Sequence, residues 1–284
     1  MGITVSEKLS GEPMASTATM RERFAGQLVI DETLRHQAGA TPRTPVQRFF
    51  GSSPLAEEAR SWYLGAVGEI AVGGILERLP EGWATRHALP VGTKDTDIDH
   101  LVVGPGGVFT INTKHHADKG IWVAGRTLLV DGQRQPYIPA ATGEAGKVAK
   151  LLGSRLPHPI AVHPLLVFVD PKRITVKERP ERVRVLNSHE VRRWLREQPA
   201  VLSADAVAEV LAVVDDPASW RATDAGDHVA ARSQFAALHA EVRAARRRRR
   251  LWGFAGMAGI VALLVGLWAL LPTLLPLILG ALAG

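Results

Sequence analysis

The first clear pattern along the chain is a helical run of apolar positions. Trp62, Ala66 and Ile70 recur at helical spacing, and Pro80 ends the run. Ser53 precedes a proline and can cap a first turn, so we expect a helix that begins at Ser53-Pro54 and ends before Pro80. Several glycines lower the intrinsic stability of this helix. Close approach to a neighbouring sheet is their expected compensation.

Short extended runs follow, separated by Gly, Asp and Lys turn signals. They predict strands over 83–91, 97–103, 108–114, 121–124 and 127–131. A helix is expected over 140–156. The strongly apolar run 160–169 predicts a central strand that is covered on both faces.

Three short elements and one long helix are expected after this strand. We expect a strand over 182–186, a helix from Ser188 to Glu197 and a helix from Ser203 to Val214, with the two serines as N-caps. A long helix that carries arginines is expected from Asp227 onward. The order is therefore helix, strands, helix, strand, and then further helices.

The C-terminal segment is apolar throughout. Residues 251–284 contain no charged residue and no histidine. At about 1.5 Å rise per residue, a helix of this length exceeds the roughly 30 Å hydrocarbon core of a bilayer. We expect one span over residues 251–271, with Trp252 and Trp268 near the two interfaces. A buried core helix and a tight double pass are the alternatives.

The net charge of +6 is concentrated beside this segment. Arg243 and Arg246 to Arg250 account for all of it, so the rest of the chain is formally neutral. The sequence pI of about 10.0 therefore indicates an arginine cluster next to the membrane and not a nucleic-acid-binding surface. Arginines are retained on the cytoplasmic side, which predicts a single-pass protein of the cell membrane with residues 1–250 in the cytoplasm. Arg246 to Arg250 are expected to attract anionic lipid.

The chain contains no cysteine. This excludes disulfides, zinc fingers, iron–sulfur ligation and thiol nucleophiles. Candidate chemistry must therefore come from other side chains.

Two of the predicted strands flank the turn Gly104-Pro105-Gly106-Gly107, which is a hairpin pattern. If Val103 pairs with Val108, Asp99 lies opposite Asn112 and Asp97 lies opposite Lys114. These four side chains then share one face, with opposed β-carbons about 5 Å apart. Such a face could hold a divalent cation between an aspartate and a second oxygen donor, while a lysine approaches the attacking water.

The same residues carry a resemblance to a known family. Gly65-x-x-Gly68-Glu69 on a helix, followed by Asp97-Ile98-Asp99-His100, Val-Gly-Pro-Gly-Gly-Val-Phe and Thr113-Lys114, resembles the nuclease-related domain (NERD) of the PD-(D/E)xK nuclease superfamily. The resemblance covers about residues 61–170. It implies a restriction-endonuclease-like α/β core, a mixed sheet flanked by helices, and the predicted order of elements agrees. A C-terminal transmembrane helix is added to this core.

The resemblance also implies site residues. Glu69 matches the helix carboxylate, Asp99 the metal-binding aspartate, Asn112 the (D/E) position and Lys114 the lysine. Glu69, Asp99 and Asn112 would hold Mg²⁺ or Mn²⁺, and Lys114 would orient the attacking water. Asn112 is neutral where the superfamily has a carboxylate, so metal affinity and water activation should both weaken.

Several other patterns have weaker meanings. Gln133-x-x-x-Tyr137 resembles an accessory motif of some superfamily members and implies a role in substrate binding. His100, His115 and His116 are expected to scatter over both faces of their strands rather than bind zinc. A set of arginines predicts either a phosphate-binding patch or a solvated face: Arg182, Arg184, Arg192, Arg193 and Arg196.

We therefore expect four regions: a poorly ordered arm over 1–53, a NERD nuclease-like domain over 54–200, a helical linker over 201–250 and a transmembrane segment over 251–284. The leading hypothesis is a membrane-anchored, metal-dependent nuclease that hydrolyses phosphodiester bonds in DNA or RNA. The alternative is a catalytically degenerate nuclease fold that serves as a membrane-tethered module for binding nucleic acid or protein.

Overall fold

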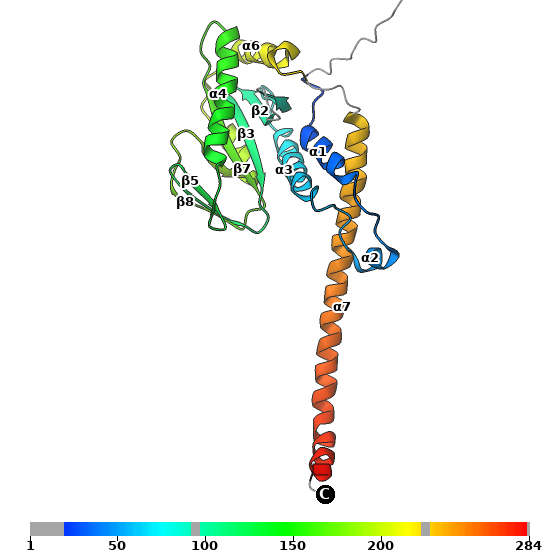
Figure 1. The fold of residues 1–284 in the computed structure, drawn as a ribbon. Helices are drawn as coiled ribbons and strands as arrows, with labels where there is room; N and C mark the ends of the chain where they lie inside the picture. Colours follow the sequence, from blue (N-terminus) through cyan, green and yellow to red (C-terminus); the bar gives the residue numbers. More distant parts are fainter. Residues whose placement is uncertain (1–19, 92–96, 223–227, 283–284) are drawn as a thin grey trace, which may run out of the picture. The chain divides into compact units, whose positions relative to one another are not determined.

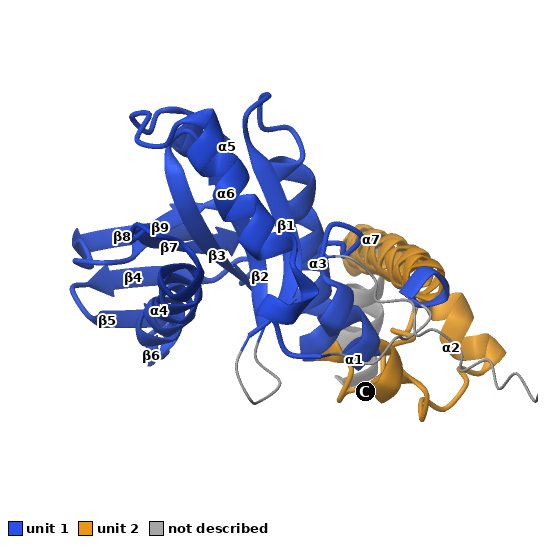
Figure 2. Cartoon of the chain, turned by 90° about the horizontal axis from the view of Figure 1, so that it is seen from above, with its two compact units in different colours: residues 1–33, 61–231 blue, residues 34–60, 232–284 orange. Residues whose placement is uncertain are grey.

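The computed structural model describes residues 20–91, 97–222 and 228–282, with side chains described as far as residue 272. The chain divides into two compact units (Figure 2). Unit 1 comprises residues 1–33 and 61–231, and unit 2 comprises residues 34–60 and 232–284. Each unit is described by itself below.

The main sheet of unit 1 has five strands in the order β1-β2-β3-β7-β9. These are β1 (Ala84–Pro90), β2 (Asp97–Gly104), β3 (Gly107–His115), β7 (Val162–Val169) and β9 (Arg184–Asn187). β1, β2 and β3 run antiparallel, whereas β3, β7 and β9 run parallel. β3 thus joins the two halves of a mixed sheet.

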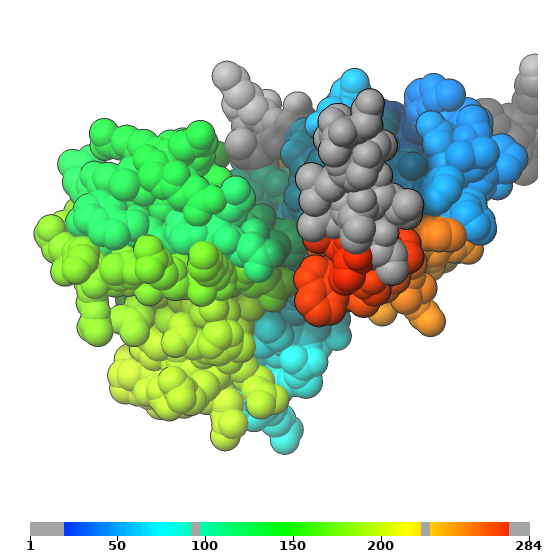
Figure 3. Space-filling model, turned by 90° about the horizontal axis from the view of Figure 1, so that it is seen from below, coloured from blue at the N-terminus to red at the C-terminus, as the bar shows by residue number. Residues whose placement is uncertain are grey.

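A second sheet in unit 1 has the order β6-β5-β4-β8. Its strands are β4 (Gly120–Ala124), β5 (Thr127–Val130), β6 (Gln133–Arg134) and β8 (Arg173–Glu178). In Figure 3 the green surface of the β4–β5 segment adjoins the yellow-green surface of later residues, consistent with the parallel pairing of β4 and β8.

Helices cover both faces of the main sheet. On one face, Leu101 and Val108 pack with Val148 and Leu152 of α4 (Tyr137–Arg155) and with the apolar side of α6 (Ala204–Asp215). On the other face, Phe109 packs with residues of α3 (Arg60–Leu76) and α5 (Ser188–Arg196). A 3₁₀ turn, η1 (Pro217–Ser219), follows α6. The fold is therefore mixed α/β with helices on both sides of the sheet, as expected, and Figure 1 shows α4 lying along β3 and β7.

The close approach to the sheet that was expected for the α3 glycines is confirmed at Gly68, where an added Cβ would lie 3.0 Å from the Cβ of His115 on β3. At Gly73 an added Cβ would lie 2.4 Å from the Cβ of Ala25, which is in the turn before α1 and not in the sheet. Gly74 has no atom within 4 Å of such a Cβ.

Unit 2 contains α2 (Pro45–Phe50) and nearly all of α7 (His228–Leu282), while α1 (Gln27–Gln37) crosses the boundary between the units. Among the described residues, α7 is the one helix that is long and apolar enough to cross a membrane. Its most apolar window has a mean hydropathy of 2.3 and is fully exposed. A buried core helix, the first alternative for this segment, does not fit that exposure.

Several predicted boundaries were wrong. α3 begins at Arg60, and the Ser53 hydroxyl accepts a hydrogen bond from the N–H of Leu55 in a local turn instead of capping this helix. α5 is capped by Asn187, which forms a capping box with Glu190, so Ser188 is inside the helix. The short strands β6 and β8 were not predicted.

The N-terminal region also differs from expectation. Residues 1–19 lie outside the described residues, but the rest of the expected arm over 1–53 includes α1 and α2. Ile30 is 1% exposed and Arg23 is 6% exposed, so part of this segment belongs to the packed interior of unit 1. The start of the predicted long helix at Asp227 lies outside the described residues as well.

Candidate metal centre

Three carboxylates meet where α3 lies beside the first residues of β2. One oxygen each from Glu69 on α3 and from Asp97 and Asp99 on β2 lies within 4.8 Å of the others. Glu69 is 5% exposed and Asp99 is 7% exposed. No other group of three His, Asp or Glu side chains with such spacing occurs in the part of the chain that the structure describes.

Backbone amides hold two of these carboxylates in place. The N–H of Thr113 on β3 donates to Asp99 at 2.5 Å, and the N–H of Gly26 donates to Glu69. Gly26 has a φ of 82°, a left-handed backbone that glycine adopts without strain. The N-terminal segment therefore contributes directly to the position of the helix carboxylate.

Three buried oxygens around this point lack a hydrogen-bond partner among the described residues: Glu69 Oε2, Asp97 Oδ2 and Asn112 Oδ1. Buried polar atoms are normally satisfied, so unpaired oxygens of this kind indicate an absent partner. Oxygen donors of carboxylates and amides are the ligands that Mg²⁺ and Mn²⁺ prefer. The residues present thus fit a hard divalent cation.

Crowding of buried charges shifts the acidity of the cluster. Burial, and then the neighbouring charge of Asp99, raises the pKa of Glu69 well above its usual range. Burial, and then the charge of Asp99, raises the pKa of Asp97 to about 7. Burial raises the pKa of Asp99 to about 6, while Lys114 opposes that rise. Without a cation, the three carboxylates cannot all be ionised at low cost.

The predicted hairpin register is confirmed only in part. Val103 pairs with Val108, as expected, and the β2–β3 ladder continues to the pair of His100 and Ile111. The ladder does not include the two other expected pairs, Asp99 with Asn112 and Asp97 with Lys114. Instead, the Asp99 side chain accepts the amide N–H of the residue after Asn112.

An irregularity in β1 accompanies this departure. Ala88 has a φ of 49° and lies where the register of β1 with β2 skips Asp99. The carbonyl oxygen of Ala88 accepts a hydrogen bond of 2.7 Å from Arg23 Nε. The register of β1 with β2 is the same on both sides of Ala88, so the irregularity is confined to the position opposite Asp99.

Asn112 is held by a carboxylate that the sequence analysis did not identify. Its amide nitrogen donates to both oxygens of Glu144 on α4, at 2.8 and 3.0 Å. Glu144 also acts electrostatically on Asp99, where its charge raises the pKa. Because the amide nitrogen is occupied, the oxygen Oδ1 is left as the unpaired side of Asn112.

Lys114 lies at the same end of β3. Its Nζ is 5.2 Å from the centre of the Tyr137 ring, and its charge acts on Glu69, Asp97 and Asp99. The Tyr137 hydroxyl is 3.0 Å from Nε2 of His116. Tyr137 is therefore next to the site, in contact with the lysine.

Gln133 is placed differently from the other predicted site residues. It is exposed on β6, in the second sheet, and none of the contacts among described residues joins its side chain to the acidic cluster. The structure thus brings only the tyrosine of the Gln-x-x-x-Tyr motif close to the lysine.

The histidines are spread over different surroundings, as expected. Nδ1 of His100 is 2.8 Å from Nδ1 of His87, and both rings are buried. Nε2 of His115 is 3.8 Å from Asp170, and His116 contacts Tyr137. Among the described residues, none of these rings joins the acidic cluster.

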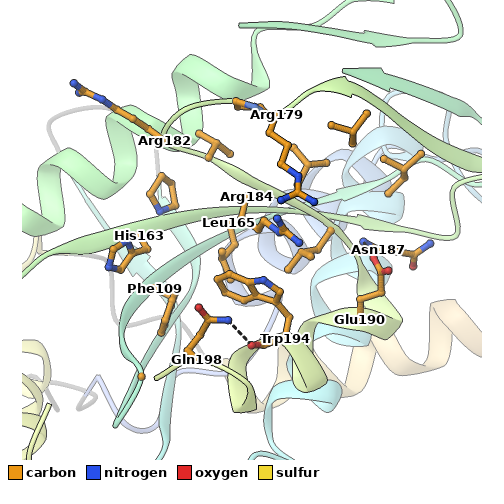
Figure 4. A pocket seen from close by; sticks show the side chains of 18 of the residues that line it. Phe109, His163, Leu165, Arg179, Arg182, Arg184, Asn187, Glu190, Trp194 and Gln198 are labelled. Carbon is orange, nitrogen blue, oxygen red and sulfur yellow. Dashed lines mark hydrogen bonds between the residues drawn. The ribbon is translucent and has the colours of Figure 1, made fainter. Parts of the chain in front are cut away.

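The predicted arginine patch is divided by the fold. Arg182 and Arg184 line a cavity of about 820 Å³ together with Arg179, Phe109 and Trp194 (Figure 4). The Arg184 guanidinium lies 5.8 Å from the centre of the Trp194 ring. The other three arginines of the patch, Arg192, Arg193 and Arg196, are exposed on α5 and do not line the cavity.

Sequence reasoning missed three contributors to the site. Asp97 was expected on the same face as Asp99, Asn112 and Lys114 but was not predicted to be a cation ligand. Arg23, whose charge favours ionisation of Asp97, lies in the segment expected to be poorly ordered. Glu144 lies on a helix 32 residues from Asn112, and no local pattern links the two. The one sequence signal for Glu144 was that it is the single acidic residue of the predicted helix over 140–156.

The fold and the site together define a class of protein. A mixed sheet flanked by helices, with carboxylates and a lysine at one end of a central hairpin, is a nuclease-like core. Residues 64–169 match the family model described as the nuclease-related domain, NERD. The chain therefore carries a nuclease-related domain, joined in sequence to a C-terminal helix that is long and apolar enough to span a membrane. No curated protein and no solved structure matches the chain.

Proposed function

We propose that this chain is a membrane-anchored, metal-dependent nuclease that hydrolyses phosphodiester bonds in DNA or RNA. The observation that carries the proposal is the group of three carboxylates, Glu69, Asp97 and Asp99, within 4.8 Å of one another, of which Glu69 and Asp99 are buried and Asp97 is half-buried. Three acids so close together and so little exposed destabilise a fold unless a cation or protons neutralise them. Their position inside a nuclease-related domain favours a cation with a catalytic use.

Each side chain has a distinct part in this proposal. Glu69 and Asp97 would hold Mg²⁺ or Mn²⁺ through their unpaired oxygens, Asp99 would contribute a carboxylate oxygen of the same cluster, and Asn112 would add its amide oxygen. Such a cation polarises a phosphate oxygen and lowers the pKa of a bound water. Lys114 would orient the attacking water and stabilise charge that develops on the phosphate. Tyr137 restrains that lysine through its ring.

The Gln133-x-x-x-Tyr137 motif is divided between β6 and α4. Gln133 and Tyr137 were expected to bind substrate, and only Tyr137 lies near the lysine. We therefore propose Tyr137 as the contact of this motif with substrate and leave Gln133 to the exposed surface of β6.

We also propose that α7 anchors the protein in the cell membrane by a single pass over residues 251–271. The apolar window of α7 is exposed, as a lipid-facing helix requires. Arg246 to Arg250 precede it and would lie on the cytoplasmic side, where they attract anionic lipid at about 1 kcal/mol per residue. Residues 1–250, with the nuclease-related domain, would then be cytoplasmic.

The test is hydrolysis by the purified full chain in detergent. With Mg²⁺ or Mn²⁺ we expect cleavage of single-stranded or double-stranded DNA or of RNA, and with a chelator we expect none. Asp99→Asn and Lys114→Met should each reduce cleavage at least about a hundredfold, because the first removes the negative charge of a cation ligand and the second removes the water-orienting charge. Glu209→Gln and Lys150→Met change exposed residues of α6 and α4 and should leave cleavage unchanged.

One observation supports a second function. Asn112 is neutral where a carboxylate is expected, and its amide nitrogen is fully engaged by Glu144. If no nucleic acid is cleaved under any of these conditions, while Mn²⁺ still binds, the chain is a membrane-tethered binding module on a nuclease fold. Cleavage that survives both Asp99→Asn and Lys114→Met would instead reject the assigned site.

A further inference from the structure

Helix α2 presents an apolar surface that the fold of unit 2 does not cover. Val46 is 65% exposed, Phe49 57% and Phe50 50%. All three lie on a helix of only six residues. Monomeric soluble proteins rarely expose adjacent large apolar side chains without a partner for them.

One side of this surface contacts α7 where the charged part of α7 meets its apolar part, and the rest of the surface stays exposed. The Phe49 and Phe50 rings lie 4.9 and 5.2 Å from the ring of Trp252, the second residue of the apolar segment. Nε1 of Trp252 donates to the carbonyl oxygen of Phe49 at 2.9 Å. Figure 1 shows α2 lying beside α7. The three rings thus form an aromatic group at one level of the long helix, which we call the aromatic collar.

Polar contacts fix the collar at this level. Nη1 of Arg248 donates to the carbonyl oxygen of Arg48 at 3.3 Å, and Arg43 forms an ion pair with Glu241. Gly51 ends α2 with a φ of 76°, and a Cβ there would lie 2.5 Å from the carbonyl oxygen of Ala245. Only a residue without a side chain allows this approach, so the position of α2 along α7 is specified by the sequence.

We propose that α2 is an interfacial membrane element, whose Val46, Phe49 and Phe50 enter the headgroup boundary of the bilayer beside Trp252. This inference rests on the proposed span of α7. The collar continues directly into the lipid-facing surface of that span, where Phe254 is 75% exposed. Arginines occupy the adjacent turns, as at the boundary between headgroups and water.

The chemistry of the collar favours lipid over a protein partner. The phenyl side chains of α2 and the indole of Trp252 on α7 lie beside basic residues, and this combination is typical of interfacial segments. The indole N–H of Trp252 is already satisfied within unit 2, and the exposed Val46, Phe49 and Phe50 offer apolar side chains. A headgroup boundary accepts such a face without requiring complementary shape or hydrogen bonds.

The absence of cysteine allows a direct test by site-specific labelling. The full chain with Val46→Cys or Phe50→Cys carries a polarity-sensitive fluorophore in vesicles of phosphatidylcholine and phosphatidylglycerol. Val46→Cys keeps all three rings of the collar. We expect blue-shifted emission at both positions. Quenching should be stronger by lipid with a doxyl group near the headgroup than by lipid with the group near the chain end.

Two control positions separate this proposal from the span itself. A label at Phe254→Cys, inside the proposed span, should be quenched by doxyl lipid, and one at Lys177→Cys on β8 should not be. Quenching at 254 without quenching at 46 and 50 would overturn the interfacial role of α2 while keeping the span. No quenching at 254 would reject the span and, with it, the role of α2. Labels at 46 and 50 that are shielded from water but insensitive to doxyl lipid would identify a protein partner and reject the lipid.

Discussion

At the scale of single residues, the pairing of Asn112 with Glu144 has the clearest consequence. In this chain α4 supplies the carboxylate of Glu144 beside the strand position where an acid is expected, and that carboxylate accepts hydrogen bonds from the Asn112 amide nitrogen. A negative charge is therefore still present next to position 112, but Glu144 carries it instead of residue 112 itself. The exchange of the two side chains is therefore informative.

Asn112→Asp should place two carboxylates in contact and lower stability without metal by about 1–3 kcal/mol. Combining it with Glu144→Gln should recover most of that loss, because the glutamine amide can donate to the new aspartate. Both variants should bind Mn²⁺ more tightly than the natural chain. Thermal unfolding in chelator and calorimetric Mn²⁺ titration measure the two effects. If the stability change of the double variant equals the sum of the changes for Asn112→Asp and Glu144→Gln measured singly, the two residues are not coupled.

The raised pKa values of Asp97 and Asp99 predict how stability depends on pH. In the folded chain Asp97 has a pKa of about 7 and Asp99 of about 6, both above the usual 3.8. The folded state therefore binds more protons than the unfolded chain between about pH 4 and pH 7, and its stability falls as pH rises through this range. Each unit of difference corresponds to about 1.4 kcal/mol.

Asp97→Asn should remove part of this dependence. In chelator, the melting temperature of the natural chain should fall more between pH 5 and pH 8 than that of the variant, and saturating Mn²⁺ should reduce the difference. Glu209→Gln, an exposed control, should retain the natural slope. Equal slopes for the natural chain and Asp97→Asn would contradict the burial of charge at this position.

At the scale of elements, α3 shows how a helix with poor intrinsic propensity is used for packing. Gly73→Ala should destabilise unit 1 by about 1–3 kcal/mol, because the new methyl group meets Ala25 at 2.4 Å. Gly74→Ala, one position later, should stabilise it by about 0.5–1 kcal/mol, because its surroundings are open and only helix propensity changes. Thermal unfolding of the full chain in detergent compares them. Loss of stability in both would contradict the packing.

The sequence was informative where the signal is local. The turn at Gly104 to Gly107 determined the β2–β3 register because a short hairpin loop leaves little freedom, and the apolar run 160–169 identified the interior strand β7. Neighbouring cap residues such as Asn187 and Ser188 are equally good in propensity, so the choice between them depends on the capping box.

Features that depend on distant segments were not predictable. β8 is a strand because it pairs in parallel with β4, some 50 residues earlier, and its own side chains are mostly exposed. The irregularity at Ala88, opposite Asp99, has no local sequence signal. Glu144 reaches Asn112 only through the packing of α4 on the sheet. The acidic cluster could be located to its hairpin, but its membership required the tertiary structure.

At the scale of the whole molecule, α7 gives a prediction about membrane attachment. Leu263→Arg with Leu267→Arg places two charges on the exposed apolar stretch, at about 2.5–3.5 kcal/mol each if they lie at the centre of a bilayer. We expect this variant to be released from membranes by alkaline carbonate. Leu263→Val with Leu267→Val should stay in the pellet. Retention of the arginine variant would argue against a span.

The three acids that share one buried corner also affect how the protein would evolve. Replacing them by apolar or amide side chains should make the polypeptide hardier, since active sites are commonly held at the expense of robustness. A library selected for heat resistance in the presence of a chelator should therefore lose Glu69, Asp97 or Asp99 early. If the heat-resistant variants keep all three carboxylates, these side chains are retained because they stabilise the packing and not because of the chemistry that they perform.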